Sequence, residues 1–174
     1  MDDILDWKHD TRSIPENGLN VTREATDAEC ERIATAMELV ACKRLVARYT
    51  IKPLHHGRYS LEGKAEIAVT QTCVVSLEEI ERRYTAPLDV ELWPAEALAQ
   101  DDADEETIVD PLGADREPIE EGRINVGRIL YEELVGAVDP YPRRDDATFE
   151  WEDREGAART HPFAALGKLK PKGG

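Results

Sequence analysis

The chain has 174 residues, of which 41% are hydrophobic and 6% aromatic, and its formal net charge is −15 at pH 7. This length and apolar content are sufficient for one domain with its own core and leave room for a tail. The large negative charge argues against a protein that wraps nucleic acid over a broad face, because phosphate binding needs clustered Lys and Arg. We therefore expect a basic protein partner or a small local basic contact with RNA, and no DNA binding.

No stretch of the chain approaches the roughly 20 apolar residues of a membrane span, and the acidic N-terminus, MDDILDWKHD, lacks a hydrophobic signal core. These features predict a cytoplasmic protein that does not bind membranes. Cys30, Cys42 and Cys73 are widely spaced and form no CxxC pair. This pattern is typical of reduced, buried thiols rather than of disulfides or a structural zinc site.

A first helix is predicted over residues 26–41. Thr26 and Glu29 have the spacing of a capping box, in which each residue satisfies a backbone N–H that the first helical turn leaves free. The residues expected on its buried face recur at helical spacing and are Ile33, Ala34, Met37, Val40 and Ala41.

A β-hairpin is predicted after this helix. Apolar and polar residues alternate through residues 44–54 and again through residues 58–73. The linker between the two runs is short and ends in Gly57, so we expect antiparallel strands. Gly63 is expected to mark a bulge or bend in the second strand.

Two shorter segments have the same alternation, residues 88–93 and residues 4–9, and the latter is expected to add an edge strand. The complete pattern predicts an α+β fold in which an antiparallel sheet of three to five strands has two main helices packed on it.

The second of these helices is predicted just before a proline-rich exit. Asn125 has the place of its N-cap, and Pro140 and Pro142 cannot supply an amide hydrogen, so the helix must end near Asp139. The apolar residues that form one face of this helix, and that we assign to the core, are Val126, Ile129, Leu130, Leu134, Ala137 and Val138.

The Pro-Tyr-Pro segment after this helix is the strongest candidate for a functional surface. It favours an extended backbone that presents Tyr141, Arg143 and Arg144 with little conformational entropy to lose on binding. We predict a partner-binding site that contains these three residues and Asp139. The alternative, a helix stop whose tyrosine packs back on its own domain, fits the pattern equally well.

Two segments lack periodicity. Residues 101–121 are rich in Asp and Glu and are interrupted by proline and glycine, which predicts a mobile acidic loop.

A single domain is expected over residues 1–149, with residues 150–174 as a flexible tail. The tail has a short basic amphipathic end, and its apolar residues are added to the predicted partner-binding site: Phe163, Leu166 and Leu169. The other interpretation of this end is a frayed terminus.

No motif for catalysis or metal binding is recognised. Gly122 and Gly127 have the spacing of a phosphate-binding loop, but the required lysine and hydroxyl residue do not follow. His55 and His56 are adjacent, so on a strand they would point to opposite faces and could not easily share one metal. The local sequence of Cys73 supplies no general base. We predict no catalytic residue, no metal and no cofactor.

The features that occur in order along the chain are the capped helix, the hairpin that leads into VTQTCVVSLE, the strand at 88–93, the acidic loop, the helix that ends on DPYPR, and a terminal PFAAL. Together they resemble the YceD family of bacterial proteins, which is named for the accumulation of large-subunit ribosomal RNA. The resemblance implies a role in making or stabilising that RNA, in a family often encoded beside a large-subunit ribosomal protein. It implies no enzymatic activity. Many relatives carry an Arg-Cys pair or a second cysteine where this chain has Thr72 and Cys73, so no metal or redox role is carried over.

Three hypotheses follow. The leading one is a non-enzymatic ribosome-biogenesis factor that supports accumulation or processing of 23S ribosomal RNA by binding a basic ribosomal protein or precursor particle. Direct RNA contact would be limited to Arg143, Arg144 and the basic tail. The alternatives are an RNA-processing enzyme that uses a divalent metal, and a small-molecule binding domain with a pocket between sheet and helices.

Overall fold

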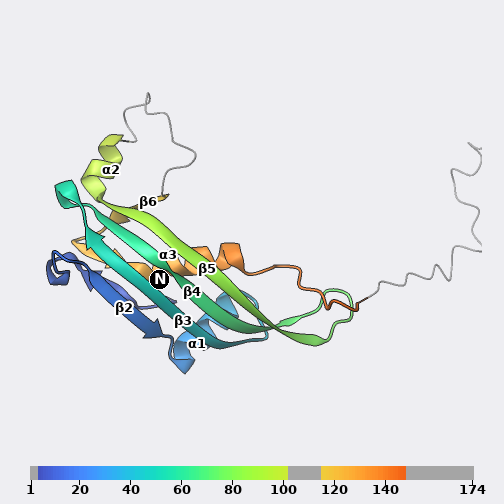
Figure 1. Ribbon diagram of the computed structural model, residues 1–174. Helices are drawn as coiled ribbons and strands as arrows, with labels where there is room; N and C mark the ends of the chain where they lie inside the picture. The colour runs from blue at the N-terminus through green and yellow to red at the C-terminus, as the bar shows by residue number, and fades with distance from the viewer. Residues whose placement is uncertain (1–3, 102–114, 148–174) are drawn as a thin grey trace, which may run out of the picture. The chain divides into compact units, whose positions relative to one another are not determined.

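The computed structural model describes residues 4–101 and 115–147, which form the α+β fold drawn in Figure 1. The chain divides into two units, Met1–Arg144 and Asp145–Gly174, and every helix and strand described below belongs to the first. The fold class is therefore α+β, as predicted. The predicted flexible tail, residues 150–174, lies outside the described residues.

Within the described part of the chain, the main sheet has five strands in the order β2-β3-β4-β5-β6. These strands are β2 (Leu19–Glu24), β3 (Ala41–Pro53), β4 (Tyr59–Thr72), β5 (Glu79–Pro94) and β6 (Asp115–Ile119). A separate two-stranded antiparallel sheet pairs β1 (Lys8–Asp10) with β7 (Arg123–Asn125). The helices are α1 (Asp27–Ala36), α2 (Ala95–Asp101) and α3 (Val126–Ala137), with short 3-10 turns at Thr11–Ser13 and His55–Gly57.

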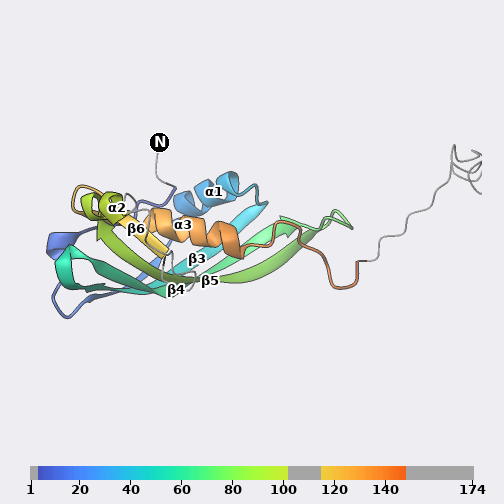
Figure 2. The same cartoon turned by 90° about the horizontal axis from the view of Figure 1, so that it is seen from above.

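The helices α1 and α3 lie on the same side of the main sheet, as Figure 2 shows. The strand residues that face them are apolar and buried, among them Leu45, Ala47, Tyr49, Ile51, Leu61, Ala65, Ile67, Val69, Ala86, Leu88, Val90 and Leu92. They alternate along each strand with residues of the opposite face, which is the period of two that the sequence predicts for a half-buried strand. The predicted apolar face of α3 completes this core, and burial of the combined surface is the main favourable contribution to folding.

Trp7 is part of the core and lies beside the start of α1. Its side chain is fully buried, and its indole Nε1 donates a hydrogen bond to Glu29 Oε1 at 2.9 Å. The other carboxylate oxygen of Glu29 accepts from the backbone N–H of Thr26 at 2.8 Å, and Thr26 Oγ1 accepts from the backbone N–H of Glu29 at 3.3 Å. The predicted capping box is therefore confirmed, and the carboxylate of Glu29 also anchors the N-terminal segment.

The predicted C-terminal boundary of this helix was wrong. α1 ends at Ala36, not at residue 41, and Glu38 follows with a positive φ of 54°, which is incompatible with a continuing helix. The chain then enters the sheet, where the backbone N–H of Val40 donates to the carbonyl of Thr70 at 3.0 Å. Pairing with the sheet therefore determines the conformation of residues that the helical spacing alone assigned to the buried face of a helix.

The main sheet is mixed rather than purely antiparallel. β6 runs parallel to the end of β5, and it lies within residues 101–121, which the sequence predicts to be a loop. Its sequence, DREPI, has no strand periodicity, so its pairing depends on the neighbouring strand. The rest of the predicted acidic loop, residues 102–114, lies outside the described residues.

Two other strand predictions were wrong in part. Only Lys8–Asp10 of the N-terminal segment is extended, and it pairs with β7, while β2 forms the edge of the main sheet. Gly63 lies in unbroken register between Tyr49 and Leu88, so no bulge occurs there. A Cβ atom at this glycine would lie 2.2 Å from the carbonyl oxygen of Arg48, so the glycine permits a close approach of two backbones.

Two glycines of α3 provide a test of this packing. A Cβ atom at Gly127 would lie 2.1 Å from the carbonyl oxygen of Leu5, whereas at Gly136 it would meet nothing within 4 Å. We expect Gly127→Ala to lower the free energy of unfolding by about 1–3 kcal/mol, because the N-terminal segment must move. Gly136→Ala should raise it by about 0.5–1 kcal/mol, because alanine favours a helix. Urea denaturation of both variants measures this difference, and equal effects would contradict the close contact.

Candidate functional site

The helix stop before the predicted site has the geometry that the sequence indicates. Asn125 caps α3, with its side chain accepting from the backbone N–H of Arg128 at 3.1 Å, and the helix ends at Ala137. The backbone N–H of Val138 still donates to Leu134, and the chain then leaves through Asp139 and Pro140. We call residues 139–144 the exit loop.

The exit loop is held against the β4–β5 hairpin by its backbone. The carbonyl oxygen of Pro142 accepts from the backbone N–H of Val74 at 3.0 Å, and the carbonyl oxygen of Arg143 accepts from the guanidinium of Arg82 at 2.5 Å. The ring of Pro142 is buried. These contacts join residues that are more than sixty positions apart in the sequence.

Asp139 has a structural part in this arrangement. Its carboxylate accepts from the backbone N–H of Tyr141 at 2.8 Å, and its backbone carbonyl accepts from Gln71 Nε2 at 2.8 Å. The same Gln71 side chain accepts from the hydroxyl of Tyr84 at 2.7 Å. The chain of hydrogen bonds therefore runs from β5 through β4 to the start of the exit loop.

The side chains of the exit loop divide into two groups. Tyr141 is 70% exposed, and Arg143 is also exposed. Arg144 instead forms an ion pair with Glu78 in the β4–β5 turn, and its backbone N–H donates to Cys73 Sγ at 3.4 Å. The predicted site residues Phe163, Leu166 and Leu169 lie outside the described residues.

A shallow groove borders the exit loop. It has a volume of about 410 Å³ and lies between the ends of α1 and α3 and the exit loop, where Met37, Val74, Val135, Val138 and Pro142 contribute to its wall. Exposed apolar side chains occur in it and in the adjacent turn: Val74 is 42% exposed, Val135 52% and Leu77 76%. We call Val74, Leu77, Val135, Tyr141 and Arg143 the exit-loop surface. The sequence interpretation missed its first three members. Val74 and Leu77 belong to no predicted element and Val135 lies outside the predicted apolar face of α3, so their apolar character was the only signal.

Cys73 lies where the turn and the exit loop meet. All three cysteines are free thiols, with Cys30 and Cys73 buried as predicted and Cys42 only partly buried. The hydroxyl of Ser76 and the backbone N–H groups of Ser76, Arg144 and Val75 donate to the thiol of Cys73, and although burial opposes them, they lower its pKa from 9.0 to about 6. The sulfur of Cys73 therefore contributes to holding the exit loop on the turn.

The described residues contain no group of three or more His, Cys, Asp or Glu side chains with an arrangement that could hold a metal ion. Among the same residues, no helix has the length and apolarity that a membrane crossing demands.

The low pKa of Cys73 predicts a pH-dependent contribution to stability. A folded-state pKa below the ordinary value stabilises the fold fully above pH 9, and this contribution disappears as the pH falls through about 6. The difference in melting temperature between the wild type and Cys73→Ala should therefore grow as the pH rises from 6 to 8.

Cys42 supplies the control for this experiment, because burial raises its pKa to about 12. The difference between the wild type and Cys42→Ala should be constant over the same pH interval. A difference for Cys73→Ala that does not change with pH would show that its thiol stays protonated in the folded protein.

Comparison with known proteins identifies the family. The family model described as "Large ribosomal RNA subunit accumulation protein YceD" matches residues 61–170. This match spans more than half of the chain and includes most of β4 and all of β5, α3 and the exit loop. No curated protein and no solved structure matches the chain. The resemblance that the order of sequence features indicates is thus confirmed, and the chain belongs to the YceD family, whose name implies a role in the accumulation of large-subunit ribosomal RNA.

Proposed function

We propose that this protein is a non-enzymatic factor in ribosome biogenesis, which supports accumulation of large-subunit ribosomal RNA by binding a basic ribosomal protein or a precursor particle. The partner contacts the exit-loop surface. Membership of the YceD family supports a role in the accumulation of large-subunit ribosomal RNA. The geometry of the exit loop supports the binding of a partner.

The observation that carries this proposal is that the backbone of the exit loop is held by hydrogen bonds while its side chains are exposed. The exit loop is fixed by hydrogen bonds from Gln71, Val74 and Arg82, all of which end on its backbone carbonyls. Tyr141 and Arg143 are therefore exposed without being needed for these bonds. A preorganised loop loses little conformational entropy on binding, and tyrosine and arginine are the residues that most often dominate interface energetics.

The charge of the chain supports a basic partner. With a formal net charge of −15, the protein attracts basic surfaces at long range and speeds their encounter. The groove beside the exit loop has Glu38 and Asp139 at its border and apolar residues in its wall. Such a surface accommodates a partner that combines apolar anchors with Lys or Arg, and its binding weakens as salt concentration rises.

The double variant Tyr141→Ala and Arg143→Ala tests the proposal. The backbone bonds of the exit loop do not use either side chain, so the melting temperature should remain close to that of the wild type. Co-sedimentation of the tagged protein with particles that contain precursor large-subunit RNA should fall about tenfold or more, because two interface anchors are lost.

A matched control removes one exposed apolar and one exposed basic side chain elsewhere, by Leu54→Ala and Arg123→Ala. This control should co-sediment as the wild type does. Unchanged co-sedimentation of the exit-loop variant would contradict the proposed surface. A large fall in its melting temperature would show that these side chains stabilise the domain, in contradiction to the 70% exposure of Tyr141, and would also overturn the proposed surface.

A further inference from the structure

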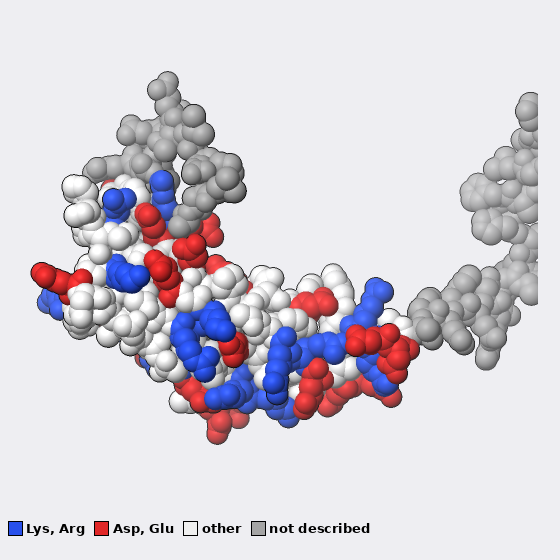
Figure 3. All heavy atoms as spheres, viewed as in Figure 1, with Lys and Arg blue, Asp and Glu red and all other residues white. Residues whose placement is uncertain are grey.

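The outer face of the main sheet, opposite α1 and α3, carries a cluster of cations. Figure 3 shows Lys and Arg side chains gathered over the middle of this face. The residues concerned lie on β3, β4 and β5 and form what we call the basic patch: Lys43, Arg44, Arg48, Lys64 and Arg83. All five are exposed, although the chain as a whole is strongly acidic.

Strand register brings these residues together. Arg44 lies opposite Ala68, which lies opposite Arg83, so one row across the sheet has a cation at each end. A second cationic row pairs Arg48 with Lys64. The row between them contains two carboxylates, Glu24 and Glu66. A third carboxylate, Glu81, lies opposite Thr70 in the next outward row beyond Arg83. Because rows on one face are about 7 Å apart, the five cations and these three carboxylates occupy one continuous surface with an excess of positive charge.

A β-bulge adds the fifth cation. Cys42 pairs with Val69, which faces the core, whereas Arg44 pairs with Ala68, which faces outward. Strict alternation would put residues 42 and 44 on the same face. Lys43 is the extra residue of the bulge, so the chain presents Lys43 and Arg44 in succession at the outer edge of the patch.

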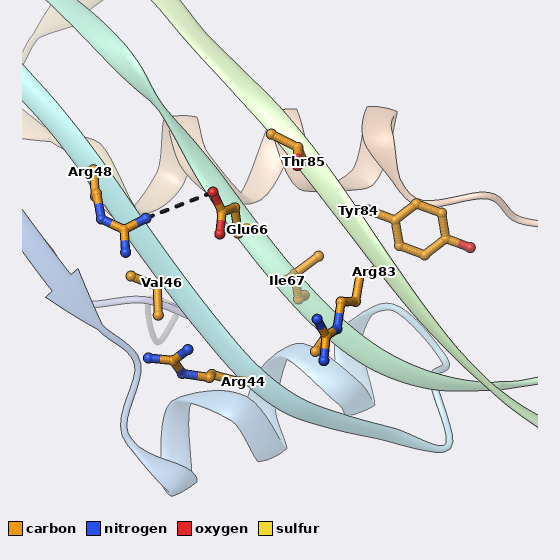
Figure 4. A pocket seen from close by; sticks show the side chains of 9 residues that line it. Arg44, Val46, Arg48, Glu66, Ile67, Arg83, Tyr84 and Thr85 are labelled. Atoms are coloured by element: carbon orange, nitrogen blue, oxygen red, sulfur yellow. Dashed lines mark ion pairs between the residues drawn. The ribbon is translucent and has the colours of Figure 1, made fainter.

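The patch surrounds a hollow rather than a flat surface. Ala68 has a small side chain between two arginines, and the hollow lined by Arg44, Arg48 and Arg83 has a volume of about 270 Å³. Figure 4 shows the guanidinium groups around it, with the ring of Tyr84 pointing away. Lys43 lines an adjoining hollow that shares Ala68 and Arg83 with the first.

Part of this positive charge is not neutralised inside the protein. Arg44 pairs with Glu24 at 2.6 Å, and Glu66 receives Lys64 at 2.8 Å and Arg48 at 3.7 Å. The cations hold the pKa of both carboxyls below the usual range, through the hydrogen bonds from Arg44 to Glu24 and from Lys64 to Glu66. Lys43 and Arg83 form no ion pair with any described residue.

We propose that the basic patch binds the phosphate backbone of RNA. Arginine presents a fork of donors that matches phosphate oxygens, and three arginines around one hollow can direct such forks at one ligand. Tyr84 is the aromatic residue among those that line the hollow, and in Figure 4 its ring points away from the three arginines, so no ring is placed for a base to stack on. The contact is therefore with the phosphate backbone and is independent of the RNA sequence. This site is separate from the exit-loop surface and adds an RNA contact to the proposed protein contact.

The affinity of the patch depends strongly on salt. Each neutralised phosphate of a single strand contributes about −0.7 to the slope of log K against log salt concentration, so use of all five cations gives a slope of about −3.5. The overall negative charge of the chain opposes RNA at a distance. Binding is therefore restricted to the patch and is favoured when another contact holds the protein near the RNA.

The test compares two double variants of the full chain. Lys43→Gln with Arg83→Gln removes the two patch cations that have no ion pair with described residues. Lys8→Gln with Arg123→Gln removes the same charge from the separate β1–β7 sheet. Binding is measured by fluorescence anisotropy with a labelled single-stranded RNA of about 20 nucleotides and mixed sequence, at several salt concentrations.

The patch variant should bind this RNA about tenfold more weakly, with a slope flattened by about 1.4 and an unchanged melting temperature. The control variant should bind as the wild type does. The proposal is overturned if the wild type does not bind the RNA, if the patch variant binds equally well, or if both variants lose affinity equally. Equal competition by a glutamate-rich peptide of the same charge would assign the patch to an acidic protein instead and would also overturn it. Co-sedimentation of the exit-loop variant reports on the proposed function independently, because its residues lie outside the patch.

Discussion

The helices α1 and α3 cover only one face of the five-stranded sheet, and the remaining features of the described fold depend on this constraint. One face of each strand must be apolar to form the core, and the other must be compatible with water. The outer face is therefore available for charge, and here its middle is basic in a chain with a net charge of −15. A sheet covered on both sides could not display such a patch.

The exit loop illustrates a second way of making a surface. Backbone carbonyls of Asp139, Pro142 and Arg143 accept hydrogen bonds from β4, the following turn and β5, so the position of the loop does not depend on its exposed side chains. Cys73 also helps to hold the loop in place, because its thiol accepts a hydrogen bond from the backbone N–H of Arg144. The groups that hold the loop in place are therefore not the side chains that it exposes. A substitution of an exposed side chain can affect binding without affecting stability.

Much of the local structure could be predicted from the sequence. The capping box of Thr26 and Glu29, the N-cap Asn125, the inward faces of β3 and β4 and the end of α3 all depend on residues that are close in the chain. The predictions failed where pairing between distant segments decided the conformation. β6 has an acidic sequence without strand periodicity and is a strand only because β5 offers a free edge. α1 is shorter than its apolar spacing suggests because Val40 pairs with β4.

The sequence by itself determined which residues form faces, where α1 and α3 begin, where α3 ends, and that Tyr141 follows a helix stop, because these are consequences of local periodicity and backbone restriction. It predicted neither the end of α1 nor α2. Only the tertiary structure decided which faces meet. It brings Arg44 and Arg83 into one row, separates the exposed Arg143 from the ion-paired Arg144, and ties Cys73 to the exit loop. Each of these contacts joins segments far apart in the chain, and strand register and one bulge, which no short sequence pattern specifies, fix their partners.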